Sequence, residues 1–84
     1  MLRVLFFGRI REELGCAHLS LEHDESTADL ERLQQELVAA NSEKWAQVLS
    51  ADNIIRAVNQ QVAQGNVALC DGDEVAFFPP VTGG

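Results

Sequence analysis

The clearest helix in the sequence spans residues 27–40, and it constrains the fold more than any other segment. Its apolar residues recur at spacings of three and four and form one stripe: Leu30, Leu33, Leu37 and Ala40. Thr27 is the predicted N-cap, and Asp29 and Glu31 interact favourably with the positive end of the helix dipole. A single apolar stripe on a polar helix is typical of a helix that lies across one face of a sheet.

The segments around this helix are predicted to be strands, because they are rich in branched and aromatic residues or alternate between apolar and polar positions. In chain order they are residues 2–7, 18–22, 54–59, 67–69 and 74–78. The first two are predicted to pair as an antiparallel hairpin. Asp71-Gly72-Asp73 supplies the turn before the last strand, which ends at Pro79 because proline cannot donate a ladder hydrogen bond.

Shorter helical segments complete the pattern. Residues 9–14 can form a short helix, and Asn41 and Ser42 end the main one. After this break, Trp45 is predicted to lie on a further helical turn or two and to fill part of the core. The order of elements in 84 residues favours a single α+β domain with one main helix packed on one face of a mixed sheet. A β-grasp arrangement fits, with the first and last strands adjacent and parallel.

Alternation assigns the two faces of the predicted sheet. Phe6 and Phe77 lie on the face that the helix covers, whereas Phe7 and Phe78 lie on the other. If the first and last strands are neighbours, Phe7 and Phe78 form an exposed apolar patch. Such a patch is usually an interface, so both rings are predicted to contact a partner, with Arg11 at the polar rim. The alternative is that both faces are covered within the chain.

The charge of the chain narrows the class of partner. Thirteen acidic residues against six basic ones give a net charge of −7 with neutral histidines. Nucleic acid and anionic membranes are bound by clusters of Lys and Arg, so neither is an expected partner, and a basic protein fits better. The apolar run Val4–Phe7 is far shorter than a signal-peptide core or a membrane span, and we expect a cytoplasmic protein.

The side chains offer little catalytic chemistry. Cys16 and Cys70 form no CxxC motif, and the acidic residues after Cys70 disfavour its thiolate, so both are predicted to be reduced structural thiols. His23, Asp24 and Glu25 are neighbours in a loop and do not converge on one metal ion, so no metal site is predicted. We do not expect the chain to be an enzyme on its own, because the sequence has no nucleophile or phosphate-binding motif.

The end of the chain, Pro79-Pro80-Val81-Thr82-Gly83-Gly84, is the strongest candidate for chemistry. Residues 81–84 are expected to be a flexible tail that reaches about 13 Å when extended. A Gly-Gly end can pass through a narrow channel and leaves its carbonyl unshielded. An ionised carboxylate is a poor electrophile, so another enzyme must activate it. Adenylation would make it an acyl donor, which sulfur could convert to a thiocarboxylate. A frayed, inert tail is the simpler interpretation.

Parts of the sequence together resemble a known family. They are the opening Val4-Leu5-Phe6-Phe7, the central Ala57-Val58-Asn59-Gln60, and the run from Asp71 to Gly84 with its acidic turn, double Phe, double Pro and Gly-Gly end. Over nearly its whole length the chain is similar to the small, sulfur-carrying subunits of molybdopterin synthase. Ubiquitin and other sulfur carriers share the Gly-Gly end, but the residues before it make the resemblance specific.

This resemblance implies a ubiquitin-like β-grasp fold and a C-terminal thiocarboxylate. Gly84 matches the sulfur-bearing position, and Gly83 is its neighbour in the segment that threads into the partner. An E1-like enzyme would adenylate the carrier with ATP, and a persulfide donor would supply the sulfur. The large synthase subunit would then use that sulfur to build the dithiolene of molybdopterin from cyclic pyranopterin monophosphate, in a heterotetramer.

The resemblance also extends the expected partner contacts along the exit of the chain: Pro79, Pro80, Val81 and Thr82. No cofactor is expected on the chain itself. Two alternatives remain open. One is a sulfur carrier for thiamine synthesis or tRNA thiolation, and the other is a ubiquitin-like interaction module with an inert end. The Phe-Phe-Pro-Pro run favours the molybdopterin branch.

Overall fold

The structure is a computed structural model that describes residues 1–50 and 53–80. In these residues one mixed sheet forms, with strand order β2-β1-β5-β3-β4. The strands are β1 (Leu2–Phe6), β2 (His18–Leu21), β3 (Ile55–Val58), β4 (Gln61–Val62) and β5 (Glu74–Phe78). β1 and β5 are parallel neighbours in the centre, as predicted, and β1 pairs with β2 antiparallel.

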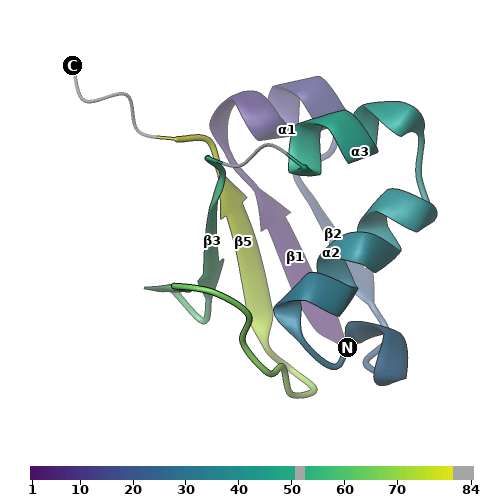
Figure 1. The fold of residues 1–84 in the computed structure, drawn as a ribbon, viewed down its shortest axis with the longest axis vertical. Helices are drawn as coiled ribbons and strands as arrows, with labels where there is room; N and C mark the ends of the chain where they lie inside the picture. The colour runs from purple at the N-terminus through teal and green to yellow at the C-terminus, as the bar shows by residue number, and fades with distance from the viewer. Residues whose placement is uncertain (51–52, 81–84) are drawn as a thin grey trace.

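The helices lie on one side of this sheet (Figure 1). They are α1 (Gly8–Leu14), the 3-10 turn η1 (Glu25–Thr27), α2 (Leu30–Ala39) and α3 (Glu43–Leu49). Leu33 of α2, Ile10 of α1 and Trp45 of α3 all join the core cluster around Phe6 and Phe77. The predicted α+β architecture with one main helix on one face is therefore confirmed in α2, with the shorter α1 and α3 beside it.

The start of α2 differs from the prediction. Asp29 is the N-cap, because its carboxylate accepts a hydrogen bond from the backbone N–H of Arg32 at 2.8 Å. Thr27 instead closes η1: its hydroxyl accepts from the backbone N–H of Asp24 at 3.0 Å, and the residue is 1% exposed. Since that hydroxyl is already used in the η1 capping box, the helix begins at the next cap-forming residue.

The prediction of a strand at residues 67–69 is wrong. The fourth strand is β4, which pairs antiparallel with β3, whereas Ala68 makes only an isolated bridge to Asp29. The backbone of residues 67–69 hydrogen-bonds to the entry of α2 instead of extending the sheet. The ends of the other predicted strands, and of the short helix predicted at residues 9–14, agree with the structure to within one residue.

Alternation along β1 and β5 assigned the two faces of the sheet correctly. Leu2, Val4 and Phe6 are fully buried under the helices, as is Phe77 on β5. Trp45 fills the core as predicted, with its ring edge-on to Phe6 at a centroid distance of 5.4 Å. None of the helices in the described part of the chain has the length and apolar character needed to cross a membrane.

Candidate functional site

The predicted tail residues Val81, Thr82, Gly83 and Gly84 lie outside the described residues. What the structure describes is the surface from which this tail leaves. β5 ends at Phe78, and Pro79 and Pro80 follow as the last described residues. The candidate site is therefore built from the elements that surround these two prolines.

The predicted aromatic pair is present on the open face of the sheet. The rings of Phe7 and Phe78 stack with a centroid distance of 4.7 Å and an interplanar angle of 4°. Phe6 and Phe77 are in register across the parallel β1–β5 pair, so the residues that follow them come to lie side by side. Phe7 is 38% exposed and Phe78 is half-buried, so the stack is accessible.

Further apolar side chains extend this face across the sheet. The strand registers form one row across four strands, in which the order of residues is Leu5, Ala76, Ala57 and Val62. Val62 is 60% exposed. Sequence reasoning missed Val62, because β4 was not predicted and its face was unassigned. Ile55 of β3 is the register partner of Phe78 and lies on the same face. We call the whole surface the sheet-face patch, and it consists of Leu5, Phe7, Ile55, Val62 and Phe78.

Charged groups lie beside the sheet-face patch. The exposed Arg3 and the half-buried Glu74 form an ion pair at 3.9 Å toward the other end of the same strands. Arg11, the predicted rim residue, is exposed on α1. Surface pairs of this kind contribute little to stability, so their main effect is on which partners can approach.

The first residue of α1 packs against the root of the tail. Gly8 has φ of +57°, and a Cβ built on it would lie 2.9 Å from Cγ of Pro79. The backbone N–H of Phe7 also donates to the carbonyl of Phe77 at 3.1 Å. The glycine therefore allows a close contact that fixes where the chain leaves the sheet.

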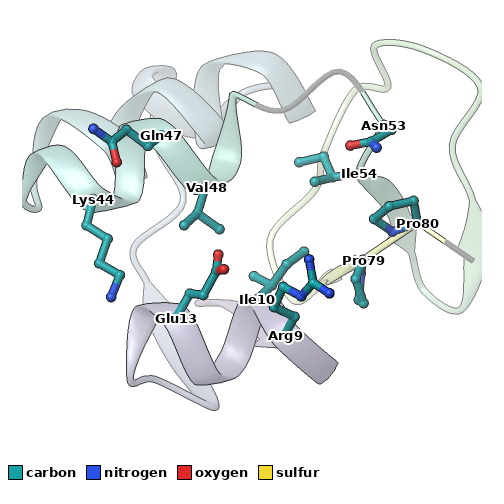
Figure 2. A pocket seen from close by; sticks show the side chains of 10 residues that line it. All are labelled: Arg9, Ile10, Glu13, Lys44, Gln47, Val48, Asn53, Ile54, Pro79 and Pro80. Atoms are coloured by element: carbon teal, nitrogen blue, oxygen red, sulfur yellow. The ribbon is translucent and has the colours of Figure 1, made fainter.

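On the helix side of the same prolines, an open cleft separates α1 from α3 (Figure 2). Arg9 and Glu13 of α1, Lys44 of α3, and both Pro79 and Pro80 line it, and its volume is about 560 Å³. We call it the tail-root cleft. Pro79 and Pro80 thus lie next to Phe78 of the sheet-face patch and also line the tail-root cleft.

The cysteines lie apart from the tail root. Cys16 is half-buried, with its Sγ donating to the carbonyl of His18 at 3.4 Å, and Cys70 is exposed; both are free thiols. Within residues 1–50 and 53–80 there is no group of three or more His, Cys, Asp or Glu side chains that could hold a metal ion.

Two carboxylates with shifted pKa values lie at the other end of β5. Hydrogen bonds from the Asn59 side chain and from the backbone N–H of Cys70 lower the pKa of Asp73 below its ordinary value. The N-terminal ammonium group, which donates to Asp71, lowers the pKa of that carboxyl group as well. These groups hold the turn before β5, whereas Pro79 follows its other end.

Comparisons with known proteins find similarity over the whole length of the chain. The ThiS family model matches residues 4–84. The molybdopterin synthase sulfur carrier subunit of Escherichia coli (strain K12) is 45% identical over 84 residues, which is 100% of both chains. The crystal structure of SAMP1 from Haloferax volcanii has a TM-score of 0.75 and 26% identity, and it covers 99% of this chain and 98% of that chain.

A further similar structure contains a partner. It is the protein–protein complex of subunits 1 and 2 of the molybdopterin-converting factor from Helicobacter pylori 26695. The similar chain has a TM-score of 0.70 and 28% identity, with 99% of this chain and 97% of that chain covered. The similar structures therefore include a complex of two subunits.

Proposed function

The chain belongs to the ThiS family, and we propose that it is the sulfur carrier subunit of a molybdopterin synthase. It has the ubiquitin-like β-grasp fold of its structural relatives. The observation that carries the proposal is similarity over the full length to a named sulfur carrier subunit, Gly-Gly end included.

The chemistry resides in the C-terminal carboxylate of Gly84. An E1-like enzyme joins this carboxylate to AMP from ATP and releases pyrophosphate, which turns a poor electrophile into an activated acyl group. The terminal sulfur of a persulfide donor then attacks the acyl group and displaces AMP, which gives an acyl disulfide. A second thiol of the donor or of the activating enzyme cleaves its S–S bond, so that a thiocarboxylate leaves and the two thiols end as a disulfide. In the active site of the large subunit this sulfur passes to cyclic pyranopterin monophosphate, where it becomes part of the molybdopterin dithiolene. The chain is a carrier in this cycle and not a catalyst on its own.

The partner surface is the sheet-face patch together with the root of the tail. Phe7 and Phe78 anchor the large subunit, and Arg11 contacts it at the rim. Exposed aromatic pairs of this kind commonly dominate the energy of an interface. With Pro79 held against Gly8, the tail starts from a fixed point. The partner's reaction centre must then lie within about 13 Å of Pro80, the reach of four extended residues.

The remaining tail residues have distinct roles. Val81 and Thr82 line the entrance to the partner's channel, and Gly83 passes its narrowest part because it has no side chain. We place the reaction in the cytoplasm, where a reducing environment keeps Cys16 and Cys70 as thiols.

Deletion of Gly84 tests this proposal most directly. The shortened chain should keep the thermal unfolding temperature of the wild type and form no molybdopterin when mixed with the activating enzyme, a persulfide donor, the large subunit and the pyranopterin precursor. Mass spectrometry should detect the thiocarboxylate on the wild type alone. Full product formation by the shortened chain would overturn the proposal.

A second variant separates threading from activation. Gly83→Val should receive sulfur poorly or transfer it poorly, since a branched residue adds width and restricts the backbone beside the reacting carbonyl. If the wild type acquires a thiocarboxylate but supplies sulfur only to a thiazole or tRNA acceptor, the carrier chemistry stands and the molybdopterin assignment fails. If protein isolated from its cell never carries sulfur, the chain is an interaction module.

A further inference from the structure

The basic residues of this acidic chain differ in whether they form ion pairs. Thirteen Asp and Glu outnumber six Lys and Arg, yet among the described residues Arg9, Arg11, Lys44 and Arg56 have no carboxylate within 4.0 Å. By contrast, Arg3 and Arg32 each form an ion pair, with Glu74 and Asp29. Of the four cations without an ion pair in the described part of the chain, Arg9 and Lys44 line the same cleft.

Both of these cations line the tail-root cleft. Arg9 comes from α1 and Lys44 from α3, and the cleft between them opens beside Pro79 and Pro80 (Figure 2). The cleft lies on the side of the sheet that the helices cover, whereas the sheet-face patch lies on the opposite face of the sheet. A protein that binds the tail would therefore contact an apolar surface on one side of Pro79 and Pro80 and a cleft with two cations on the other side.

We propose that the tail-root cleft is a second docking surface, which binds an acidic segment of the protein that receives the tail. This inference rests on the proposed function, in which that protein is the large synthase subunit. The cleft volume of about 560 Å³ accommodates a few side chains of a protruding segment. Its occupant is negatively charged, because Arg9 and Lys44 supply the positive charge that a carboxylate pairs with.

The two surfaces contribute different things to docking. Apolar contact at the sheet-face patch supplies most of the affinity, but it does not define one orientation strongly. Charge pairs with Arg9 and Lys44 define the orientation, because a rotated partner would place its acids against the acidic remainder of the chain. Orientation is decisive here, since the tail must point into one reaction centre.

Charge reversal tests the proposal against a matched control. Arg9→Glu and Lys44→Glu should each weaken binding to the large subunit about tenfold or more, with the deficit growing at low salt. Arg32→Glu makes the same change in net charge on α2, outside the cleft, and should alter the dissociation constant by less than about twofold. Arg9→Lys should restore most of the affinity. Titration calorimetry measures binding, and thermal unfolding confirms that the variants are folded.

Photo-crosslinking identifies the occupant. A benzophenone amino acid at Gln47, which lines the cleft, should couple to a segment of the large subunit rich in Asp and Glu. The same probe at the exposed Gln35 of α2 should give little product. A crosslink to a basic or apolar segment, or to this chain's own tail, would overturn the proposal.

The outcomes separate this inference from the function on which it rests. If the wild type neither binds the large subunit nor delivers sulfur, the proposed function fails. If the wild type does both and Arg9→Glu and Lys44→Glu behave like Arg32→Glu, the function stands and the cleft proposal alone is wrong. Tighter binding after charge reversal would also contradict it, because that result indicates a basic segment in the cleft.

Discussion

Two pairs of stacked phenylalanines lie one residue apart in the chain, at the end of β1 and at the end of β5, but they differ in burial and in what surrounds them. Phe6 and Phe77 stack at 5.7 Å with an interplanar angle of 16°, and Phe7 and Phe78 stack at 4.7 Å and 4°. The first pair is at most 1% exposed. The second lies on the open face, and Phe7 is accessible.

Their surroundings explain the difference. The inner pair is covered by the helices, with Trp45 packed edge-on against Phe6 at 5.4 Å. No helix in the described residues contributes such a ring to the outer pair. Because successive side chains of a strand point to opposite faces, two adjacent phenylalanines can serve stability on one face and recognition on the other. The comparison shows that the contribution of a stacked pair to the stability of the fold depends on whether other side chains cover it.

Truncation of the inner pair should have the largest effect on stability. Phe77→Ala should cost about 3 to 5 kcal/mol of unfolding free energy, since it leaves a cavity in a closely packed core. Phe78→Ala should cost much less. Urea unfolding measures both, and the milder Phe77→Leu keeps the comparison possible if Phe77→Ala fails to fold. A larger loss for Phe78→Ala would mean that the roles of the two faces are reversed.

Truncation of the outer pair should have its main effect on binding. Phe7→Ala and Phe78→Ala should each weaken association with the large subunit by about 1 to 4 kcal/mol. Val62→Ala should have a smaller effect, because it removes less apolar surface from the edge of the patch. Calorimetry measures the change, and unaltered affinity in both Phe variants would show that the partner docks elsewhere.

The contrast between the two pairs was predictable from the sequence, because alternation and strand order alone determine the faces. The start of α2 was not. Thr27 and Asp29 are both suitable N-cap residues. Asp29 caps α2 because the hydroxyl of Thr27 already accepts a hydrogen bond from the backbone N–H of Asp24, in a turn that the helix periodicity does not reveal.

β4 and the cleft escaped prediction for different reasons. The turn into β4 places Asn59 and Gln60 at φ of 50° and 70° without any glycine, so the usual hairpin signal is missing. The tail-root cleft joins Arg9, Lys44 and Pro79, which are far apart in the chain, and its position depends on how α1 and α3 pack. Such juxtapositions have no local sequence signal.

Alanine substitutions at the two ends of α1 test whether the contact between Gly8 and Pro79 positions the tail. Gly8 and Gly15 have φ of +57° and +65°, so alanine should strain either position by about 1 to 2 kcal/mol. Only at Gly8 does an added Cβ approach another residue closely, at 2.9 Å from Cγ of Pro79; at Gly15 nothing lies within 4 Å.

Both alanine variants should therefore lose stability, Gly8→Ala more than Gly15→Ala because of the added contact with Pro79. Gly8→Ala alone should slow sulfur transfer, by several-fold in single-turnover assays. Pro79→Ala in the Gly8→Ala background should recover part of that rate, because it removes the ring atoms involved in the clash. Equal transfer rates in Gly8→Ala and Gly15→Ala would show that this contact does not position the tail.

The smallest expected effect concerns the turn that sets the register of both stacks. Asp73 binds β1 through its backbone carbonyl, which accepts from the N–H of Arg3 at 3.0 Å. Its carboxylate accepts hydrogen bonds from Asn59 and Cys70 at 3.0 and 2.8 Å, and these bonds hold its pKa below the ordinary value of 3.8. A lowered pKa in the folded state means that the charged form stabilises the fold.

This contribution is fully present above pH 3.8 and is lost as the pH falls through the lowered value. The wild type should thus lose stability on acidification, with Asp24 and Asp71 acting in the same direction. Asp73→Asn should be less stable at neutral pH and show a shallower decline in acid, because one of the titrating groups is gone. The turn sets the register for both stacks. On acidification, the change in Trp45 fluorescence that reports unfolding and the loss of binding to the large subunit should therefore occur over the same pH range. An acid decline as steep as that of the wild type would mean that Asp73 does not contribute to it.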